Sequence, residues 1–130
     1  MTLVIDASVI VAGLIDTGTE GIWAESLIAS ENLLAPELIM VEATNILRRL
    51  ELAKEISPIE SGLAQMDLMR LDVQLFPFNP FAERIWSLRN NLTSYDAWYV
   101  ALAEALDCPL ATLDLKLTKA SGARCAFAVP

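Results

Sequence analysis

The chain has 130 residues, of which 55% are hydrophobic, and this is enough for one ordinary globular domain. Its 9 basic and 17 acidic residues give a net charge of −8, which argues against a protein that holds nucleic acid on a broad basic surface. Histidine is absent, which excludes Ser-His and Cys-His nucleophile pairs. If the protein is an enzyme, we expect its chemistry to rest on carboxylates.

Two further features bear on where the protein works. No apolar stretch is long enough to span a membrane, and Asp6 interrupts an apolar N-terminus that lacks the basic start of a signal peptide. Cys108 and Cys125 do not form a C-x-x-C pair, so we expect two free thiols rather than a disulfide or a zinc site. These features predict a cytoplasmic protein that does not enter a membrane.

Short apolar runs alternate with helical patterns along the chain. The predicted strands are Leu3–Ile5, Leu33–Ala35, Val73–Phe76, Leu110–Thr112 and Ala126–Val129. The predicted helices, three of which have a proline in the first turn, are Ser8–Ile15, Glu20–Ser30, Pro36–Lys54, Pro58–Leu71, Pro80–Asn91 and Ser94–Leu106. This alternation predicts right-handed crossovers and a mostly parallel sheet. We therefore predict an α/β fold, a three-layer α/β/α sandwich in which residues 1–130 form a single domain.

Two acidic residues stand at the ends of predicted strands. Asp6 follows Leu3–Ile5 directly, and Asp114 follows Leu110–Thr112 after one further residue. In open parallel sheets, ligands bind beyond the carboxyl ends of the strands, near the point where the strand order reverses. Each of these residues, taken alone, is explained equally well as the N-cap of a following helix.

Glu42 lies on the predicted helix 36–54, where it interrupts an otherwise apolar stripe. A buried carboxylate needs a partner such as a metal ion, an arginine or a proton. The alternatives to a metal ion are that Arg48 or Arg49, further along the same helix, folds back to pair with Glu42, or that this face of the helix is less buried than the pattern suggests.

Asp96 lies in the first turn of the strongly apolar helix 94–106. Its neighbours one and two helical turns away are Tyr99, Val100 and Ala103, so Asp96 faces the side that packs on the sheet. The helix dipole by itself also favours an acidic residue in a first turn.

Taken together, two strand ends and two helix faces of a parallel sheet can bring four carboxylates into one pocket. Four neighbouring carboxylates cannot remain ionised without cations. Oxygen ligands select hard ions, so Mg²⁺ or Mn²⁺ is the expected cofactor, and a water molecule bound to the metal is the expected nucleophile. The predicted metal ligands and catalytic residues are Asp6, Glu42, Asp96 and Asp114.

Four segments resemble the motifs of PIN domains in VapC-type toxins, which belong to type II toxin–antitoxin systems. They are Ile5–Ser8, Val41–Asn45, Tyr95–Ala103 and Thr112–Asp114. The block Leu92–Ala97, followed by the apolar helix, is the most specific part, and the similarity runs essentially from end to end.

The resemblance implies an endoribonuclease that hydrolyses RNA with Mg²⁺ or Mn²⁺ bound by the four acidic residues. Asp6 and Asp96 would be the chief metal ligands, and Glu42 and Asp114 would complete the site. Two hydroxyl side chains, those of Ser8 and Thr112, would orient carboxylates or water. The resemblance also implies a homodimer that is silenced by a VapB-type antitoxin.

Basic residues that touch RNA phosphates are harder to identify from the sequence, because most of them lie on predicted solvent-facing helix surfaces. Arg89 and Lys116 are the candidates closest to the predicted site. Trp23, Met40, Met66 and Met69 are ordinary core residues or, alternatively, border grooves for a partner helix.

Three other functions remain open at this stage. A DNA nuclease of the same fold would use the same site chemistry, because that chemistry does not require the ribose 2′-hydroxyl. A non-catalytic partner-binding module would use the acidic residues only as helix caps and surface pairs. Aspartate-based phosphotransfer also uses strand-end acidic residues, but haloacid-dehalogenase-like domains place an acid two residues after the first, where this chain has Ser8.

Overall fold

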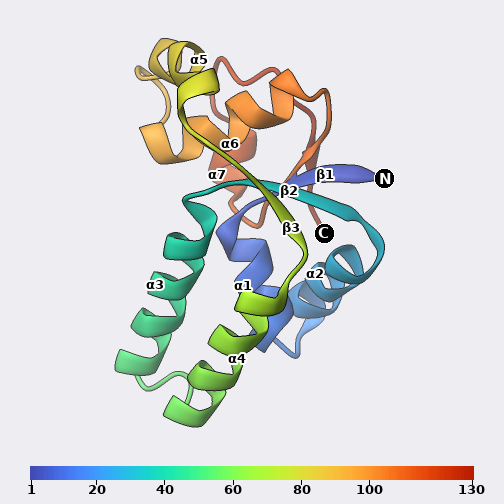
Figure 1. Ribbon diagram of the computed structural model, residues 1–130, viewed down its shortest axis with the longest axis vertical. Coiled ribbons are helices and arrows are strands. Elements are labelled where there is room, and N and C mark those ends of the chain that lie inside the picture. Colours follow the sequence, from blue (N-terminus) through green and yellow to red (C-terminus); the bar gives the residue numbers. More distant parts are fainter.

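The computed structural model describes all residues from Met1 to Pro130, and its course is shown in Figure 1. The strands are β1 (Thr2–Ile5), β2 (Asn32–Pro36), β3 (Val73–Phe76), β4 (Leu110–Ala111) and β5 (Phe127–Ala128). The helices are α1 (Ala7–Ile15), α2 (Thr19–Ser30), α3 (Ile39–Leu52), α4 (Pro58–Arg70), α5 (Ala82–Ser87), α6 (Ser94–Ala105) and α7 (Leu115–Thr118), with a 3₁₀ turn η1 (Asn79–Phe81). All five predicted strands are confirmed.

The strands form one parallel sheet in the order β3-β2-β1-β4-β5. Val4 in the central strand pairs with Leu34 of β2 on one side and with Leu110 of β4 on the other. The chain adds β2 and β3 on one side of β1, and then β4 and β5 on the opposite side. The strand order therefore reverses between β1 and β4, which is where open α/β sheets bind their ligands.

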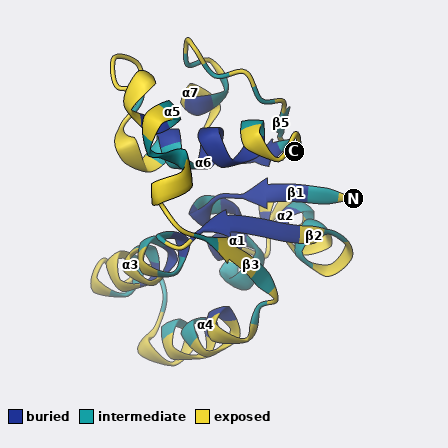
Figure 2. Cartoon of the chain, turned by 45° about the horizontal axis from the view of Figure 1, so that its top comes forward, coloured by how far each residue is buried: buried dark blue, intermediate teal, exposed yellow.

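Helices cover both faces of the sheet, which confirms the predicted α/β/α sandwich. In Figure 2, α1, α3 and α4 lie against one face, whereas α5 and α6 lie against the other. Helix α6 packs on β1, β2 and β4, while α2 packs on α1. The residues of β1 do not alternate between apolar and polar, because Leu3, Val4 and Ile5 are buried on both sides of the strand.

Helix α3 begins later than predicted, and Pro36 belongs to a strand instead. Pro36 is buried as the last residue of β2, where it stands opposite Phe76 of β3. A proline donates no backbone hydrogen bond, and it is tolerated at this position because the strand ends there. The turn after it leads to Ile39, the first residue of α3.

The predicted helix 80–91 is also shorter in the structure. Pro80 lies in the η1 turn, as a first-turn proline should, but α5 ends at Ser87. The Ser87 hydroxyl donates to the carbonyl of Arg84 at 2.6 Å, and such local bonds compete with continuation of a helix. The short helix α7 was not predicted, because four residues are too few for helical periodicity to show.

The methionines, the cysteines and the helix lengths bear on three further predictions. Met66 and Met69 of α4 are exposed, whereas Trp23 and Met40 are partly buried against the core. Both cysteines are free, as predicted. None of the helices combines the length and the apolar character that crossing a membrane requires.

Candidate active site

The four acidic residues lie at the carboxyl ends of the strands because the connecting helices of a parallel sheet all start there. Asp6 follows β1, and Asp114 comes three residues after the end of β4. Glu42 and Asp96 lie in the first turns of α3 and α6. The backbone N–H of Asp6 donates to the carbonyl of Ala111 at 3.1 Å, which ties the ends of β1 and β4 together.

Asp6 is the most buried of the four, with 8% of its surface exposed. Its Oδ1 accepts hydrogen bonds from the Ser8 hydroxyl at 2.5 Å and from the Val9 backbone N–H at 3.2 Å, so Asp6 does cap α1. Burial raises the pKa of the Asp6 carboxyl, and the hydroxyls of Ser8 and Thr112 lower it in part. A helix cap on an exposed surface would not carry this electrostatic cost.

Glu42 has a partner that the sequence analysis did not identify. The Tyr99 hydroxyl of α6 donates to Glu42 Oε1 at 2.6 Å. Burial raises the pKa of Glu42, the Tyr99 hydrogen bond lowers it, and the charges of Asp96 and Asp6 raise it further. The predicted alternative of a salt bridge to Arg48 or Arg49 is wrong, since the only salt bridges join Met1 to Glu31 and Arg84 to Glu104.

Asp96 faces the sheet, as its spacing predicted, because Tyr99, Val100 and Ala103 on the same side of α6 are all buried. Burial raises the pKa of Asp96, as does the charge of Asp114, whereas a hydrogen bond with Thr93 lowers it. Helix α6 is capped by Thr93, whose hydroxyl accepts the Asp96 backbone N–H at 3.1 Å. Asp96 is therefore not needed as a cap.

Asp114 is exposed and caps α7, with its Oδ1 accepting the backbone N–H groups of Lys116 at 3.0 Å and Leu117 at 3.4 Å. Thr112 is fully buried, and its hydroxyl accepts the Asp114 backbone N–H at 3.0 Å. Thr112 thus stands between the two strand-end acids, since it also interacts with Asp6.

The basic residues expected near the site remain exposed. Lys116 is the second residue of α7, the helix that Asp114 caps. Arg89 lies with its guanidinium 4.6 Å from the ring centre of Trp86, whose surface is 66% exposed. Neither residue forms a salt bridge.

The four carboxylates influence one another in pairs rather than as a closed cluster. The charges of Asp96 and Asp6 raise the pKa of Glu42, and the charge of Asp114 raises the pKa of Asp96. No three of them are close enough, as the side chains stand, to hold one metal ion. Side-chain rotation is needed for that, which accords with the mutual repulsion of carboxylates that no cation neutralises.

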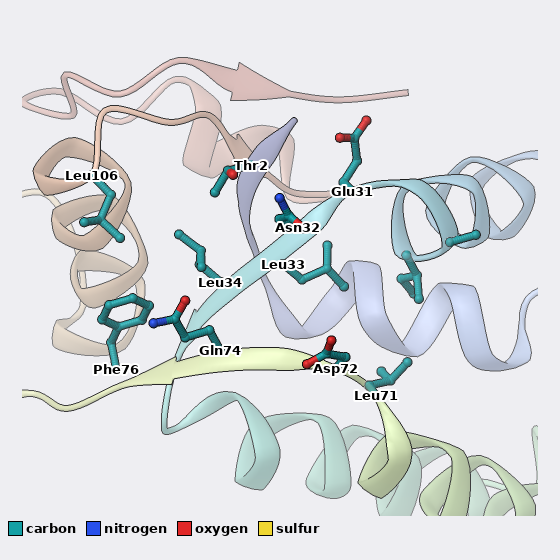
Figure 3. Close-up of a pocket in the computed structure, with 12 residues that line it drawn as sticks. Thr2, Glu31, Asn32, Leu33, Leu34, Leu71, Asp72, Gln74, Phe76 and Leu106 are labelled. Carbon is teal, nitrogen blue, oxygen red and sulfur yellow. The ribbon is translucent and has the colours of Figure 1, made fainter.

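A large cavity lies away from these acids. It has a volume of about 840 Å³ and lies over the beginnings of β1 and β2 and along β3. Figure 3 shows Leu34 and Gln74 on neighbouring strands of this cavity, with Leu106 at the end of α6 beside Phe76. None of the four acidic residues lines it.

Sequence reasoning also missed an ion pair that holds the C-terminal segment. Arg84 of α5 donates from Nε to Glu104 Oε1 at 2.7 Å and from one terminal nitrogen to the Gly122 carbonyl at 2.7 Å. Glu104 Oε2 in turn accepts the Arg124 backbone N–H. Residues 20 or more positions apart have no local pattern that would reveal such a contact.

Comparisons with known proteins identify the family. The PIN domain model matches residues 3–123. Ribonuclease VapC9 of Mycobacterium tuberculosis is 41% identical over 127 residues, which cover 98% of this chain and 97% of that protein.

Two solved structures share the fold. VapC20 of Mycobacterium tuberculosis, described as a toxin that cleaves the sarcin–ricin loop, has a TM-score of 0.70 at 14% identity, covering 97% of this chain and 99% of that one. VapBC2 of Rickettsia felis, bound to a DNA fragment of its promoter, has a TM-score of 0.68 at 12% identity. The match covers 99% of this chain and 98% of that one. The chain belongs to the PIN-domain family and, within it, to the VapC group.

Proposed function

We propose that this protein is a divalent-metal-dependent endoribonuclease and the toxin of a VapBC-type pair, with residues 1–130 acting as one PIN domain. The observation that carries the proposal is that burial raises the pKa values of Asp6, Glu42 and Asp96 at one edge of the sheet, where no basic side chain pairs with them. Perturbed carboxyl groups of this kind are typical of functional sites. The ribonuclease relative supports RNA as the substrate.

The side chains present fit a hard divalent cation. The four acids and the two hydroxyls of Ser8 and Thr112 offer only oxygen, which Mg²⁺ and Mn²⁺ prefer. Asp6 and Asp96 would be the chief ligands, and Glu42 and Asp114 would complete the set. Glu42 Oε2 and Asp114 Oδ2 have no hydrogen-bond partner in the protein, so each has a free oxygen to offer.

When bound, the cation supplies an activated water molecule and neutralises charge on the phosphate oxygens. The chain's own residues prepare the site for it. Ser8 and Thr112 hold the buried Asp6 by hydrogen bonds, and burial excludes competing water from this carboxylate. Arg89 and Lys116 are exposed and are the side chains that we assign to RNA phosphates.

Incubating total cellular RNA with the purified protein and Mn²⁺ or Mg²⁺ tests this proposal. We expect discrete products that disappear with EDTA and with Asp6→Asn, which keeps the cap of α1 but removes the charge. Asp67→Asn is the matched control, because Asp67 is exposed on α4 and should leave cleavage unchanged.

The same assay separates the rival functions. Single-stranded DNA of the cleaved sequence, used beside the RNA, tests for a DNA nuclease, and equal cleavage of both would contradict a ribonuclease. No cleavage of either, together with no Mn²⁺ binding by calorimetry, would favour a non-catalytic binding module.

A groove between α1 and α3 supports the antitoxin as partner. It runs from Ser8 past Ile15 and Ile46 to Ile56, with a volume of about 460 Å³. An apolar groove with polar ends suits an amphipathic segment of another protein, and the Rickettsia felis relative was solved as a VapBC complex. We expect Ile46→Glu to prevent co-purification with a co-expressed antitoxin, whereas Val41→Glu on the outer face of α3 should not.

A homodimer in the cytoplasm completes the proposal. RNA lies in that compartment, and the two free thiols suit a reducing environment. Light scattering on the purified protein tests the oligomeric state, and a monomeric mass at micromolar concentration would contradict the dimer.

A further inference from the structure

Tyr99 is a buried phenol that connects two helices of the candidate site. It has 2% of its surface exposed and lies on α6, one helical turn after Asp96. Its hydroxyl donates to Glu42 Oε1 at 2.6 Å, across 57 positions of sequence. This is the only side-chain hydrogen bond between α3 and α6.

The choice of acceptor is informative. A buried tyrosine hydroxyl needs a hydrogen-bond partner, and a backbone carbonyl would serve for packing alone. The acceptor here is instead the carboxylate of Glu42, which is repelled by the charges of Asp96 and Asp6. A neutral donor to a carboxylate makes a short, strong bond without neutralising the negative charge, as an arginine would.

The bond also leaves half of the carboxylate free. Tyr99 engages only Oε1 of Glu42, and Oε2 has no hydrogen-bond partner. A glutamate side chain has three rotatable bonds. Because the Tyr99 hydroxyl holds Oε1 in place, the positions that Oε2 can reach by rotation are few. Mutation of a residue that supports a metal ligand in this way typically lowers metal affinity by about 10- to 100-fold.

We propose that Tyr99 is a positioning residue that holds Glu42 by one oxygen, so that the free oxygen binds a divalent cation together with Asp6 and Asp96 once side-chain rotation brings the carboxylates together. The inference rests on the proposed metal site. Tyr99 acts through Glu42, and it does not itself contact the cation or the RNA.

Calorimetric titration of the full-length chain with MnCl₂, in the absence of RNA, tests the proposal. We expect Tyr99→Phe to weaken Mn²⁺ binding by about tenfold, the scale typical of residues that support a metal ligand. Tyr95→Phe is the matched control, because Tyr95 is 61% exposed and should leave the affinity unchanged. Circular dichroism of each variant checks that the fold is intact.

A double-mutant cycle with Glu42→Gln separates positioning from packing. If Tyr99 acts through Glu42, adding Tyr99→Phe to Glu42→Gln should weaken Mn²⁺ binding no further. Tyr99→Met provides a second route if Tyr99→Phe does not fold, because it also removes the hydroxyl donor and leaves an apolar side chain that adapts to the buried space. It should weaken Mn²⁺ binding to a similar extent.

The outcomes are distinguishable. Two outcomes would overturn the role of Tyr99 without affecting the metal site. One is wild-type Mn²⁺ affinity in a folded Tyr99→Phe variant, and the other is a double variant whose loss of affinity equals the sum of the two single losses. Absence of Mn²⁺ binding by the wild-type chain would overturn the metal site and the role of Tyr99 with it.

Discussion

The two edges of the sheet differ in how their acidic groups are accommodated. At the carboxyl edge, burial raises the pKa values of Asp6, Glu42 and Asp96, and none of these residues has a basic partner. At the amino edge, beside the cavity of Figure 3, Glu31 forms a salt bridge of 2.8 Å with the N-terminal ammonium of Met1, and Asp72 is exposed to water. The cavity lies at the amino edge, but the charges there are paired or exposed.

This difference shows that the large cavity and the buried acids lie at different edges of the sheet. The cavity of about 840 Å³ lies where the helices leave part of one sheet face uncovered. Buried carboxylates without cations, by contrast, raise the free energy of the folded chain unless a ligand relieves them. The unsatisfied edge is therefore the better candidate for an active site.

Substituting one acid at each edge gives the largest expected contrast. Asp96→Asn should lower the rate of RNA cleavage by more than about 100-fold, because it removes one of the chief ligands of the proposed metal site. Asp72→Asn should leave the rate unchanged, since Asp72 is exposed beside the other cavity. Initial rates with Mn²⁺ measure both, and an equal loss in the two variants would erase the distinction between the edges.

Divalent cations should stabilise the protein through the carboxyl edge alone. At a free Mn²⁺ concentration of about 100 times Kd, the gain in unfolding free energy is about 2.7 kcal/mol. We expect the corresponding rise in Tm at neutral pH in the wild-type chain and in Asp72→Asn, measured by differential scanning calorimetry. Its persistence in Asp96→Asn would place the bound cation somewhere else.

Acidification should increase the contribution of the three buried carboxyl groups to the stability of the metal-free protein. A carboxyl group whose pKa is higher in the folded chain than in the unfolded one binds its proton more readily when folded. Stability therefore rises as the pH falls through the folded pKa, and the gain is complete below the unfolded value of about 4. Asp6, Glu42 and Asp96 all shift in this direction.

Asp6→Asn isolates one of these contributions. We expect the metal-free variant to be more stable than wild type at neutral pH by about 0.5–2 kcal/mol, because asparagine can cap α1 without a buried charge. The difference should shrink toward pH 4. Urea unfolding at several pH values measures it, and a less stable variant at neutral pH would show that the charge of Asp6 is not costly.

The smallest effect is expected at the amino edge. Glu31→Gln removes an ion pair with the N-terminus, whose partner Met1 is largely exposed, and such pairs contribute about 0.5 kcal/mol. RNA cleavage should be unchanged. A loss of cleavage in this folded variant would show that the two edges are coupled.

The strands and the acidic residues were predictable because their signals are local. Each strand is a short apolar run, and Asp6 and Asp114 follow two of these runs directly or nearly so. The start of α3 was not predictable in this way. Pro36 suits the first turn of a helix as well as the end of a strand, and only its pairing opposite Phe76 decides between them.

The sequence by itself therefore determined the α/β class, the parallel sheet and the edge at which the four acids lie, since periodicity and chain order carry that information. The tertiary structure alone decided which partner each acid has. Glu42 meets Tyr99 of α6 rather than Arg48 or Arg49 of its own helix, and Asp114 turns to cap α7. Such choices depend on distances between segments far apart in the chain, and no local pattern records them.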